Sequence, residues 1–224
     1  MYEFLDNMVW KTLTGAHERF AVGSGGARRY APGFSPIVGF ADRENPDFAS
    51  LAEHCEAGET FYTGGWSGPI PSAWDLDMES SLVNMVWDGR MAEAETVRAV
   101  ELGRKEAEAA LELAMLTHPG PFGLRTLELG EYYGVSDGAK LVSMAGERFW
   151  TGTFREISGV CTHPDYQGQG LAKGLMNKLI RRQLERGETP MLHVMSDNHL
   201  ARGLYQRMGF RDHQEYVLRV FSKA

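Results

Sequence analysis

Residues 167–172 read Gln167-Gly168-Gln169-Gly170-Leu171-Ala172. They stand between a strand-like run, Glu156 to Thr162, and an amphipathic helix-like run, Gly170 to Arg186. A glycine-rich turn at a helix N-terminus presents backbone N–H groups, and the helix dipole adds to their attraction for an anion. Because Gly168 and Gly170 have no Cβ, the backbone can approach a phosphate closely there. The stretch therefore predicts a site for a phosphorylated cofactor.

Two other phosphate-binding loops do not fit these residues. A Walker loop requires G-x-x-x-x-G-K-[ST], and the chain contains no such string. A Rossmann fingerprint requires a third glycine where Lys173 stands. What remains is the pattern Q-x-x-G-x-A, carried by Gln167, Gly170 and Ala172.

A second motif follows downstream. Residues 190–194 read as a short buried strand, and after it comes N-x-x-A-x-x-x-Y-x-x-x-G-F on Asn198, Ala201, Tyr205, Gly209 and Phe210. Ala201 and Tyr205 are four residues apart and share one face of the predicted helix. A glycine at position 209 is typical of a left-handed helix end.

The first motif resembles the acetyl-coenzyme A pyrophosphate loop of the GNAT superfamily of N-acetyltransferases, and the second resembles another cofactor-contacting motif of that superfamily. The resemblance runs from about Ala94 to the C-terminus. It implies an α/β fold with a mixed, mostly antiparallel sheet flanked by helices. It also implies acetyl-CoA as acetyl donor and direct transfer to a primary amine without an acyl-enzyme. The alternative is a catalytically silent CoA-binding or regulatory module, since a fold does not fix a function.

The C-terminal part of the chain alternates strand and helix patterns in the order that this resemblance implies. The dipeptide Asp137-Gly138 is a hairpin turn signal between the second and third strands. Strands are expected at 96–102, 126–135, 140–150, 156–162, 190–194 and 215–221, and helices at 106–116, at 170–186 and around Ala201.

The first ninety or so residues are less regular. A helix is expected at 47–55, and strands are expected at 59–64 and 80–87. We divide the chain into an N-terminal α/β segment, residues 1–92, and a GNAT-like domain, residues 93–224. The N-terminal segment is expected to form a substrate wall or a dimer surface, and its short elements hint at a degenerate half-copy of the second domain.

Composition limits the classes of partner. The formal net charge is −7, which disfavours nucleic acid and is compatible with a cationic amine, either a small molecule or a peptide. Two cysteines are too few for a disulfide framework or a thiolate metal cluster, so no metal is expected. The chain shows no long apolar run and no signal-peptide pattern, so we expect a cytoplasmic protein without a membrane partner. A homodimer is compatible with the sequence.

Tyr205 is the candidate general acid, because the resemblance places its phenol near the coenzyme sulfur. Glu156 is the candidate base, acting directly or through a water, although it could instead pair with Arg155. Glu147 and His193 are further candidates for the base. A tyrosine on an apolar helix face can also be a core residue, as can a histidine in an apolar strand.

The resemblance also assigns residues to the cofactor. Backbone groups of Val160 and Thr162, with Cys161 between them, are expected to pair with the pantetheine arm as a further strand would. Asn198 is expected to cap its helix and to reach the cofactor. The loop Gln167, Gly168, Gln169, Gly170, Leu171 and Ala172 is expected to hold the pyrophosphate. A small amine, an antibiotic, an amino acid, a peptide N-terminus and a lysine side chain all remain open as acceptor.

Overall fold

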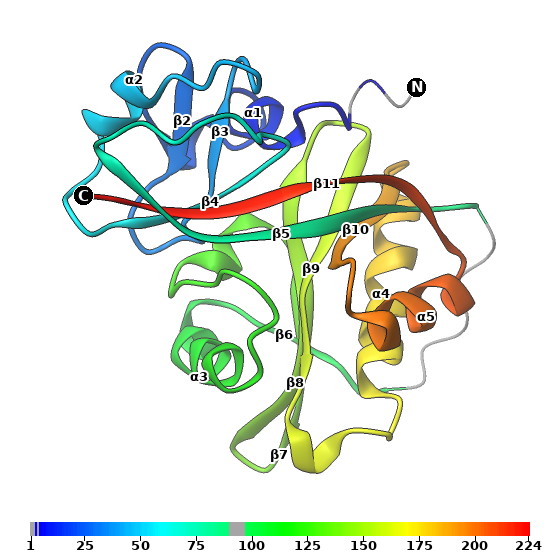
Figure 1. Ribbon diagram of the computed structural model, residues 1–224. Helices are drawn as coiled ribbons and strands as arrows, with labels where there is room; N and C mark the ends of the chain where they lie inside the picture. The colour runs from blue at the N-terminus through cyan, green and yellow to red at the C-terminus, as the bar shows by residue number, and fades with distance from the viewer. Residues whose placement is uncertain (1–2, 4, 90–96) are drawn as a thin grey trace.

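The structure, a computed structural model, describes residue 3, residues 5–89 and residues 97–224. Its centre is an eight-stranded mixed sheet in the order β4-β11-β5-β10-β9-β8-β7-β6, and a small sheet of order β1-β2-β3 lies beside it (Figure 1). The strands are β1 Ala21–Val22, β2 Ala27–Tyr30, β3 Val38–Phe40, β4 Thr60–Gly64, β5 Trp74–Trp87, β6 Val100–Glu101, β7 Tyr132–Asp137, β8 Lys140–Trp150, β9 Phe154–Thr162, β10 Thr189–Met195 and β11 Phe210–Lys223.

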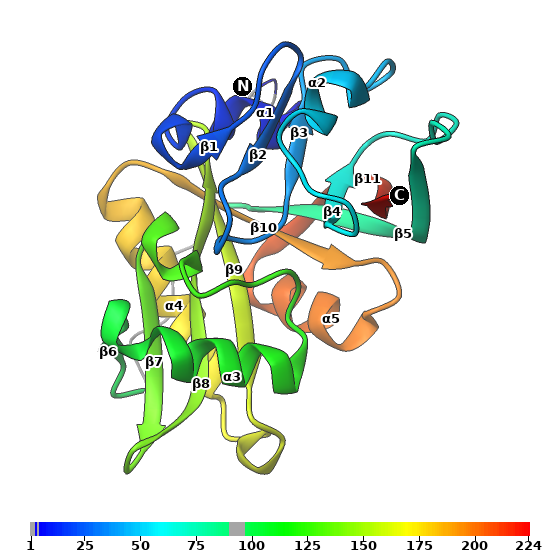
Figure 2. The ribbon, with the colours of Figure 1, turned by 90° about the vertical axis from the view of Figure 1, so that its left-hand side faces the viewer.

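Helices cover both faces of the large sheet. Figures 1 and 2 show α3 (Ala107–Thr117) and α4 (Leu171–Glu185) on opposite sides of β8 and β9. The amphipathic pattern of α4 explains its place, because Leu175, Met176 and Leu179 are fully buried in the core, where the helix packs on β8, β9 and β10. The remaining helices are α1 (Met8–Leu13), α2 (Phe48–Ala52) and α5 (His199–Met208).

The N-terminal segment contributes a strand to the middle of the large sheet. β5 lies between β10 and β11 and pairs antiparallel with both, from Met195↔Leu82 on one side to Lys223↔Trp74 on the other. β4 forms an edge strand of the same sheet, and the remaining part of the segment forms a cap, in which Met8 and Tyr30 pack with Phe149 and Met191 in one cluster. The two predicted domains therefore share one sheet. Their predicted boundary at 92/93 lies outside the described residues, and the division stays a prediction.

Two predicted strands differ from the structure. Residues 126–129 form a 3-10 helix, and β7 begins only at Tyr132. The Oγ1 atom of Thr126 accepts a hydrogen bond from the Gly123 N–H, and Arg125 pairs with Glu128 one turn on, so that side chains favour a turn over an extended strand. Of the strand expected at 96–102, the described part forms only the short β6.

Candidate active site

β9 and β10 run side by side for only part of their length. Their parallel pairing extends from Phe154↔Thr189 to Ile157↔Leu192. β9 then continues to Thr162 and β10 to Met195, and no pairing between them follows within the described part of the chain. The backbone edge of β9 beyond Ile157 is consequently free to bind an extended ligand.

A β-bulge explains why the two strands separate. Ser158 pairs with Gly146 and Cys161 pairs with Met144, so β9 has one residue more than β8 across this interval. Within the interval, Gly159 adopts a left-handed φ of +62°, which glycine tolerates best. A bulge of this kind bends its strand and turns it away from its neighbour. A glycine inside a strand pattern is the signal that could have revealed the bulge in the sequence.

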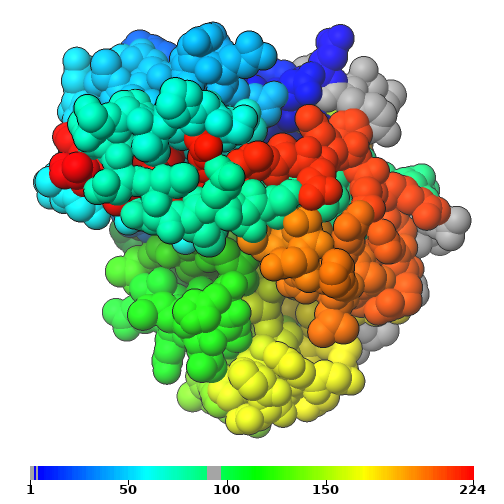
Figure 3. All heavy atoms as spheres, in the orientation of Figure 1, coloured from blue at the N-terminus to red at the C-terminus, as the bar shows by residue number. Residues whose placement is uncertain are grey.

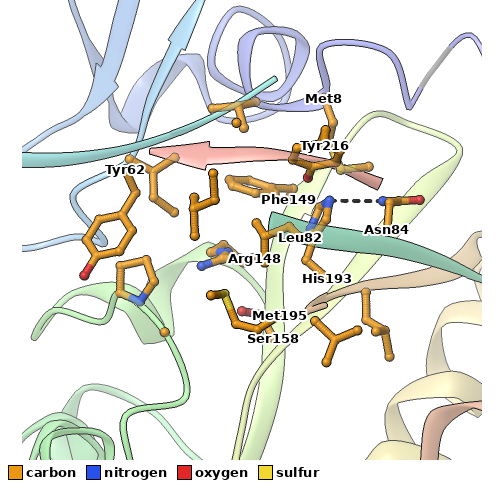
Figure 4. A pocket seen from close by; sticks show the side chains of 18 of the residues that line it. Met8, Tyr62, Leu82, Asn84, Arg148, Phe149, Ser158, His193, Met195 and Tyr216 are labelled. Atoms are coloured by element: carbon orange, nitrogen blue, oxygen red, sulfur yellow. Dashed lines mark hydrogen bonds between the residues drawn. The ribbon is translucent and has the colours of Figure 1, made fainter. Parts of the chain in front are cut away.

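A cavity of about 430 Å³ opens where the strands separate. One end is formed by the separated strands and α5, with Ser158, Val160, Asn198 and Tyr205 on its wall. The other end is formed by Met8 of the N-terminal cap and Tyr62 of β4 (Figure 4). Figure 3 shows the surface hollowed between α3 (green), β5 (teal) and the segment after β10 (orange).

Glu156 lies behind the cavity wall. Its side chain is 1% exposed, and its two oxygens accept from Nε and Nη2 of Arg148 at 2.9 and 2.8 Å. Nδ1 of His193 lies 2.7 Å from Oε1. Burial, the largest single influence, would raise the pKa of Glu156, but the charge of Arg148 and the bond from His193 lower it to about 2. The Glu156 carboxylate is thus fixed as an anion, and it pairs with Arg148 instead of Arg155.

His193 connects this carboxylate to the cavity. The ring lines the cavity, whereas Glu156 does not. Because Glu156 is anionic, Nδ1 carries the proton of the short contact, and Nε2 faces the Asn84 amide nitrogen at 3.0 Å (Figure 4). The Oδ1 atom of Asn84 is buried and has no partner among the described residues. A turn of this amide would let Oδ1 accept from a protonated Nε2.

Glu147 lies away from the cavity. It accepts hydrogen bonds from the Glu131 N–H at 3.1 Å, from Gln183 at 3.0 Å and from Arg186. Arg155 approaches it to 3.8 Å and pairs with Glu188 at 2.9 Å. Because this buried ionic cluster ties β8 and β9 to the end of α4, the geometry gives Glu147 a structural place and removes it from the candidates for the base.

Tyr205 stands on the cavity wall at the end formed by α5. Its ring packs edge-on against Phe210, with centroids 6.2 Å apart. Its hydroxyl makes no hydrogen bond to any residue that the structure describes. Burial raises its pKa to about 12, so the phenol keeps its proton at neutral pH. The side chain combines the core contact expected of an apolar face with a hydroxyl available to a ligand.

The glycine loop has the geometry of an anion cradle. Gly168 and Gly170 have φ angles of +77° and +78°, and an added Cβ would meet nothing within 4 Å at either position. α4 begins at Leu171 with neither an acidic residue in its first turn nor a side-chain cap. The N–H groups of residues 168–172 find no acceptor in the described chain, so they are available to an anionic ligand.

The other residues assigned to the cofactor are Val160, Cys161 and Thr162 on β9 and Asn198 at the start of α5. Val160 lines the cavity, and Thr162 bonds to Ser143 through its hydroxyl at 2.8 Å. The Cys161 side chain points into the core with α3, where burial raises its thiol pKa to about 11, so only its backbone can contact a ligand. Asn198 caps α5, accepting from the Ala201 N–H at 3.1 Å, and also lines the cavity.

The described residues contain no cluster of three or more histidine, cysteine, aspartate or glutamate side chains that could hold a metal ion. None of their helices is both long enough and apolar enough to cross a membrane.

The fold and the separated strands define an acyltransferase-type α/β protein, and comparisons agree. A model of the Acetyltransferase (GNAT) family matches residues 100–210. A putative acetyltransferase of the GNAT family from Novosphingobium aromaticivorans is 31% identical, with 98% of each chain covered and a TM-score of 0.87. The chain belongs to the GNAT acetyltransferase family.

More distant structures share the fold. A GCN5-related N-acetyltransferase-like protein from Streptococcus suis is 16% identical over 97% of this chain and 92% of its own, with a TM-score of 0.61. A GCN5-related N-acetyltransferase from Kribbella flavida is 13% identical over 96% and 95%, with a TM-score of 0.58. Because these likenesses include the N-terminal part of the chain, the cap belongs to the shared architecture.

Proposed function

We propose that this protein is an acetyl-CoA-dependent N-acetyltransferase that moves the acetyl group directly to a primary amine. The observation that carries the proposal is the separation of β9 and β10 after Ile157↔Leu192, which leaves a free strand edge beside a cavity. The glycine loop at the start of α4 supplies an anion cradle that follows the same strand in the chain. The free strand edge matches the extended arm of a nucleotide thioester, and the glycine loop matches its pyrophosphate.

The residues present fit acetyl-CoA. The N–H groups of residues 168–172 would hold the pyrophosphate, the β9 edge at Val160 and Thr162 would pair with the amide-rich arm, and Asn198 would contact the arm from α5. The cofactor supplies an acetyl group that is activated as a thioester.

His193 is the group that accepts a proton from the attacking amine in this proposal. It reaches the cavity, and the anionic Glu156 behind it stabilises an imidazolium. Asn84 can accept from that imidazolium after its amide turns, which satisfies an otherwise unpartnered Oδ1. Glu156 is a positioning residue in this arrangement, and His193 is the catalytic one.

Tyr205 is the group that donates a proton or a hydrogen bond to the departing sulfur. Its hydroxyl is protonated at neutral pH and lies on the cavity wall beside the β9 edge. The Met8 and Tyr62 end of the cavity, contributed by the N-terminal cap and β4, is proposed as the acceptor side. A donor and an acceptor of protons on one cavity favour an enzyme over a silent CoA-binding module.

Calorimetry with CoA and a turnover assay with acetyl-CoA and a broad amine panel test the proposal. We expect CoA to bind and at least one primary amine to be acetylated. Binding of CoA with no turnover on any amine would favour the silent module. Failure of CoA to bind at all would reject both functions.

A further inference from the structure

The electrostatics of the acceptor end of the cavity are unusual for an enzyme that acts on amines. Two arginines, Arg43 and Arg148, line the cavity. No aspartate or glutamate side chain stands on the wall within residues 5–89 and 97–224. A polycationic acceptor would therefore meet positive charge without a carboxylate to pair with it.

Arg43 offers a guanidinium without a partner in the part of the chain that the structure describes. It is partly buried between the N-terminal cap and β11, and it makes no hydrogen bond or ion pair with any other described residue. Its charge acts on Tyr216: burial raises the pKa of that phenol, and Arg43 works in the opposite direction. The Tyr216 ring in turn packs edge-on against His193, with centroids 5.8 Å apart. Tyr216 thus interacts with Arg43 through charge and with the proposed base through its ring.

Arg148 leaves a donor available as well. Its Nε and Nη2 atoms donate to Glu156, while Nη1 has no acceptor in the described chain. The Tyr216 hydroxyl is likewise without a partner among those residues. Between these donors and His193 the wall is apolar and aromatic, with Tyr62, Leu82 and Phe149 (Figure 4). A carboxylate is the group that arginine binds with two parallel hydrogen bonds.

We infer that the acceptor is an amine that also carries a carboxylate, such as an amino acid or short peptide with an apolar side chain, and that Arg43 binds this carboxylate. The inference rests on the proposed function and names its substrate class. An acceptor of this class would satisfy the free donors and fill the apolar wall at once.

Binding of acetylated products tests the inference without requiring turnover. The probes are N-acetylphenylalanine and N-acetylglycylphenylalanine, each compared with its own C-terminal amide by calorimetry in the presence of CoA. We expect at least one acid to bind about tenfold or more tightly than its amide, the loss expected when a charge-assisted hydrogen bond is removed. Equal binding of acid and amide, or no binding of any probe, would overturn the inference.

Two variants assign the effect to Arg43. Arg43→Gln should bring the acid-to-amide affinity ratio close to one. Arg104→Gln, which removes an arginine outside the cavity, should keep the wild-type ratio. An unchanged ratio in Arg43→Gln would overturn the role of this residue. If the acids bind selectively and no amine of the broad panel, phenylalanine and glycylphenylalanine included, is acetylated, the carboxylate site is supported and the proposed enzymatic function fails.

Discussion

The Nδ1 atom of His193 lies 2.7 Å from Oε1 of Glu156, and this contact joins a fully buried carboxylate on β9 to an imidazole that reaches the cavity from β10. Met191 is the residue of β10 that pairs with Glu156, and His193 lies two positions further along the same strand. The two side chains meet on one face because alternate residues of a strand share a face. The contact lies beside Ile157↔Leu192, the last residue pair before the two strands separate, so the fold places His193, the proposed proton acceptor, where the cavity opens.

If His193 accepts the amine proton, His193→Gln should lower kcat/KM by about 10²-fold, the low end of general base effects. It should also remove the limb of the pH profile in which activity falls with falling pH, because the imidazole must be neutral to accept a proton. CoA affinity, measured by calorimetry, should stay near the wild-type value. A variant that keeps the wild-type pH profile would move the role to a water chain or to Glu156 itself.

Glu156→Gln should reduce stability as well as rate. It leaves Arg148 buried without its counter-ion, and losing one member of a buried pair costs on the order of 3 kcal/mol. The pKa of Glu156 falls from 4.5 in the unfolded chain to about 2 in the fold, so its contribution is complete above pH 4.5 and is lost as the pH falls toward 2.

The measurement is the difference in unfolding free energy between wild type and Glu156→Gln, obtained by urea denaturation at several pH values. We expect this difference to shrink steadily as the pH is lowered from 4.5. Taking the difference cancels the titration of carboxylates that both proteins share. A difference that stays constant across this range would contradict an anionic Glu156.

Gly170→Asp should weaken CoA binding because it places a negative charge at the start of α4, where the pyrophosphate is proposed to sit. Gly170→Asn is the matched control, since it adds a side chain of the same shape at the same φ of +78° without the charge. We expect the aspartate variant to bind CoA at least about tenfold more weakly than the asparagine variant, or about 1.4 kcal/mol. Equal affinities of the two folded variants would reject the site.

The sequence predicted the parts of the site that depend on local pattern. The glycine loop, the start of α4 near Leu171 and the Asn198 cap of α5 all follow from short-range rules, and the structure has them. The location of β5 between β10 and β11 could not be predicted, because strand order depends on contacts between distant segments. The GNAT fold class is confirmed even so.

The environment of Glu156 was beyond sequence reasoning for the same reason. Strict alternation places Glu156 on one face of β9 with Ser158, Val160 and Thr162, but the structure packs Val160 with Ile157 in the cluster under α4. The partners of Glu156 come from other strands, Arg148 from β8 and His193 from β10. The bulge at Gly159 shifts the register between strands, and a register shift changes which side chains meet. Arg43, from a loop after β3, carries no motif at all and became visible only through the cavity that it lines.

Gly159→Ala should close or distort the cleft. Gly159 has a φ of +62°, and an added Cβ would come within 3.2 Å of the Tyr132 ring, so both backbone strain and crowding are expected. Gly138→Ala is the control, because Gly138 has a φ of +59° with open space around it. We expect both variants to lose about 1 kcal/mol or more of stability, and only Gly159→Ala to lose CoA affinity as well. If Gly159→Ala and Gly138→Ala bind CoA with equal affinity, the bulge at Gly159 is not required for cofactor binding.

The last prediction is that Tyr205 assists the departing thiolate. Tyr205→Phe keeps the ring and its contact with Phe210 and deletes only a hydroxyl that has no partner among the described residues, so stability should change little. A purely structural tyrosine would leave kcat unchanged, whereas a proton donor predicts a loss of about 10²-fold in kcat with CoA affinity preserved.

Tyr133→Phe serves as control, because its hydroxyl donates to Glu131 outside the cavity. Steady-state kinetics at saturating acetyl-CoA distinguish the two roles when the chemical step limits turnover. A pre-steady-state burst would show that a later step limits it instead. Because burial raises the pKa of Tyr205 to about 12, the wild-type profile should show no decline from this residue below about pH 11. If the Tyr205→Phe enzyme keeps most of its kcat under these conditions, Tyr205 has only a packing role in the hydrophobic core.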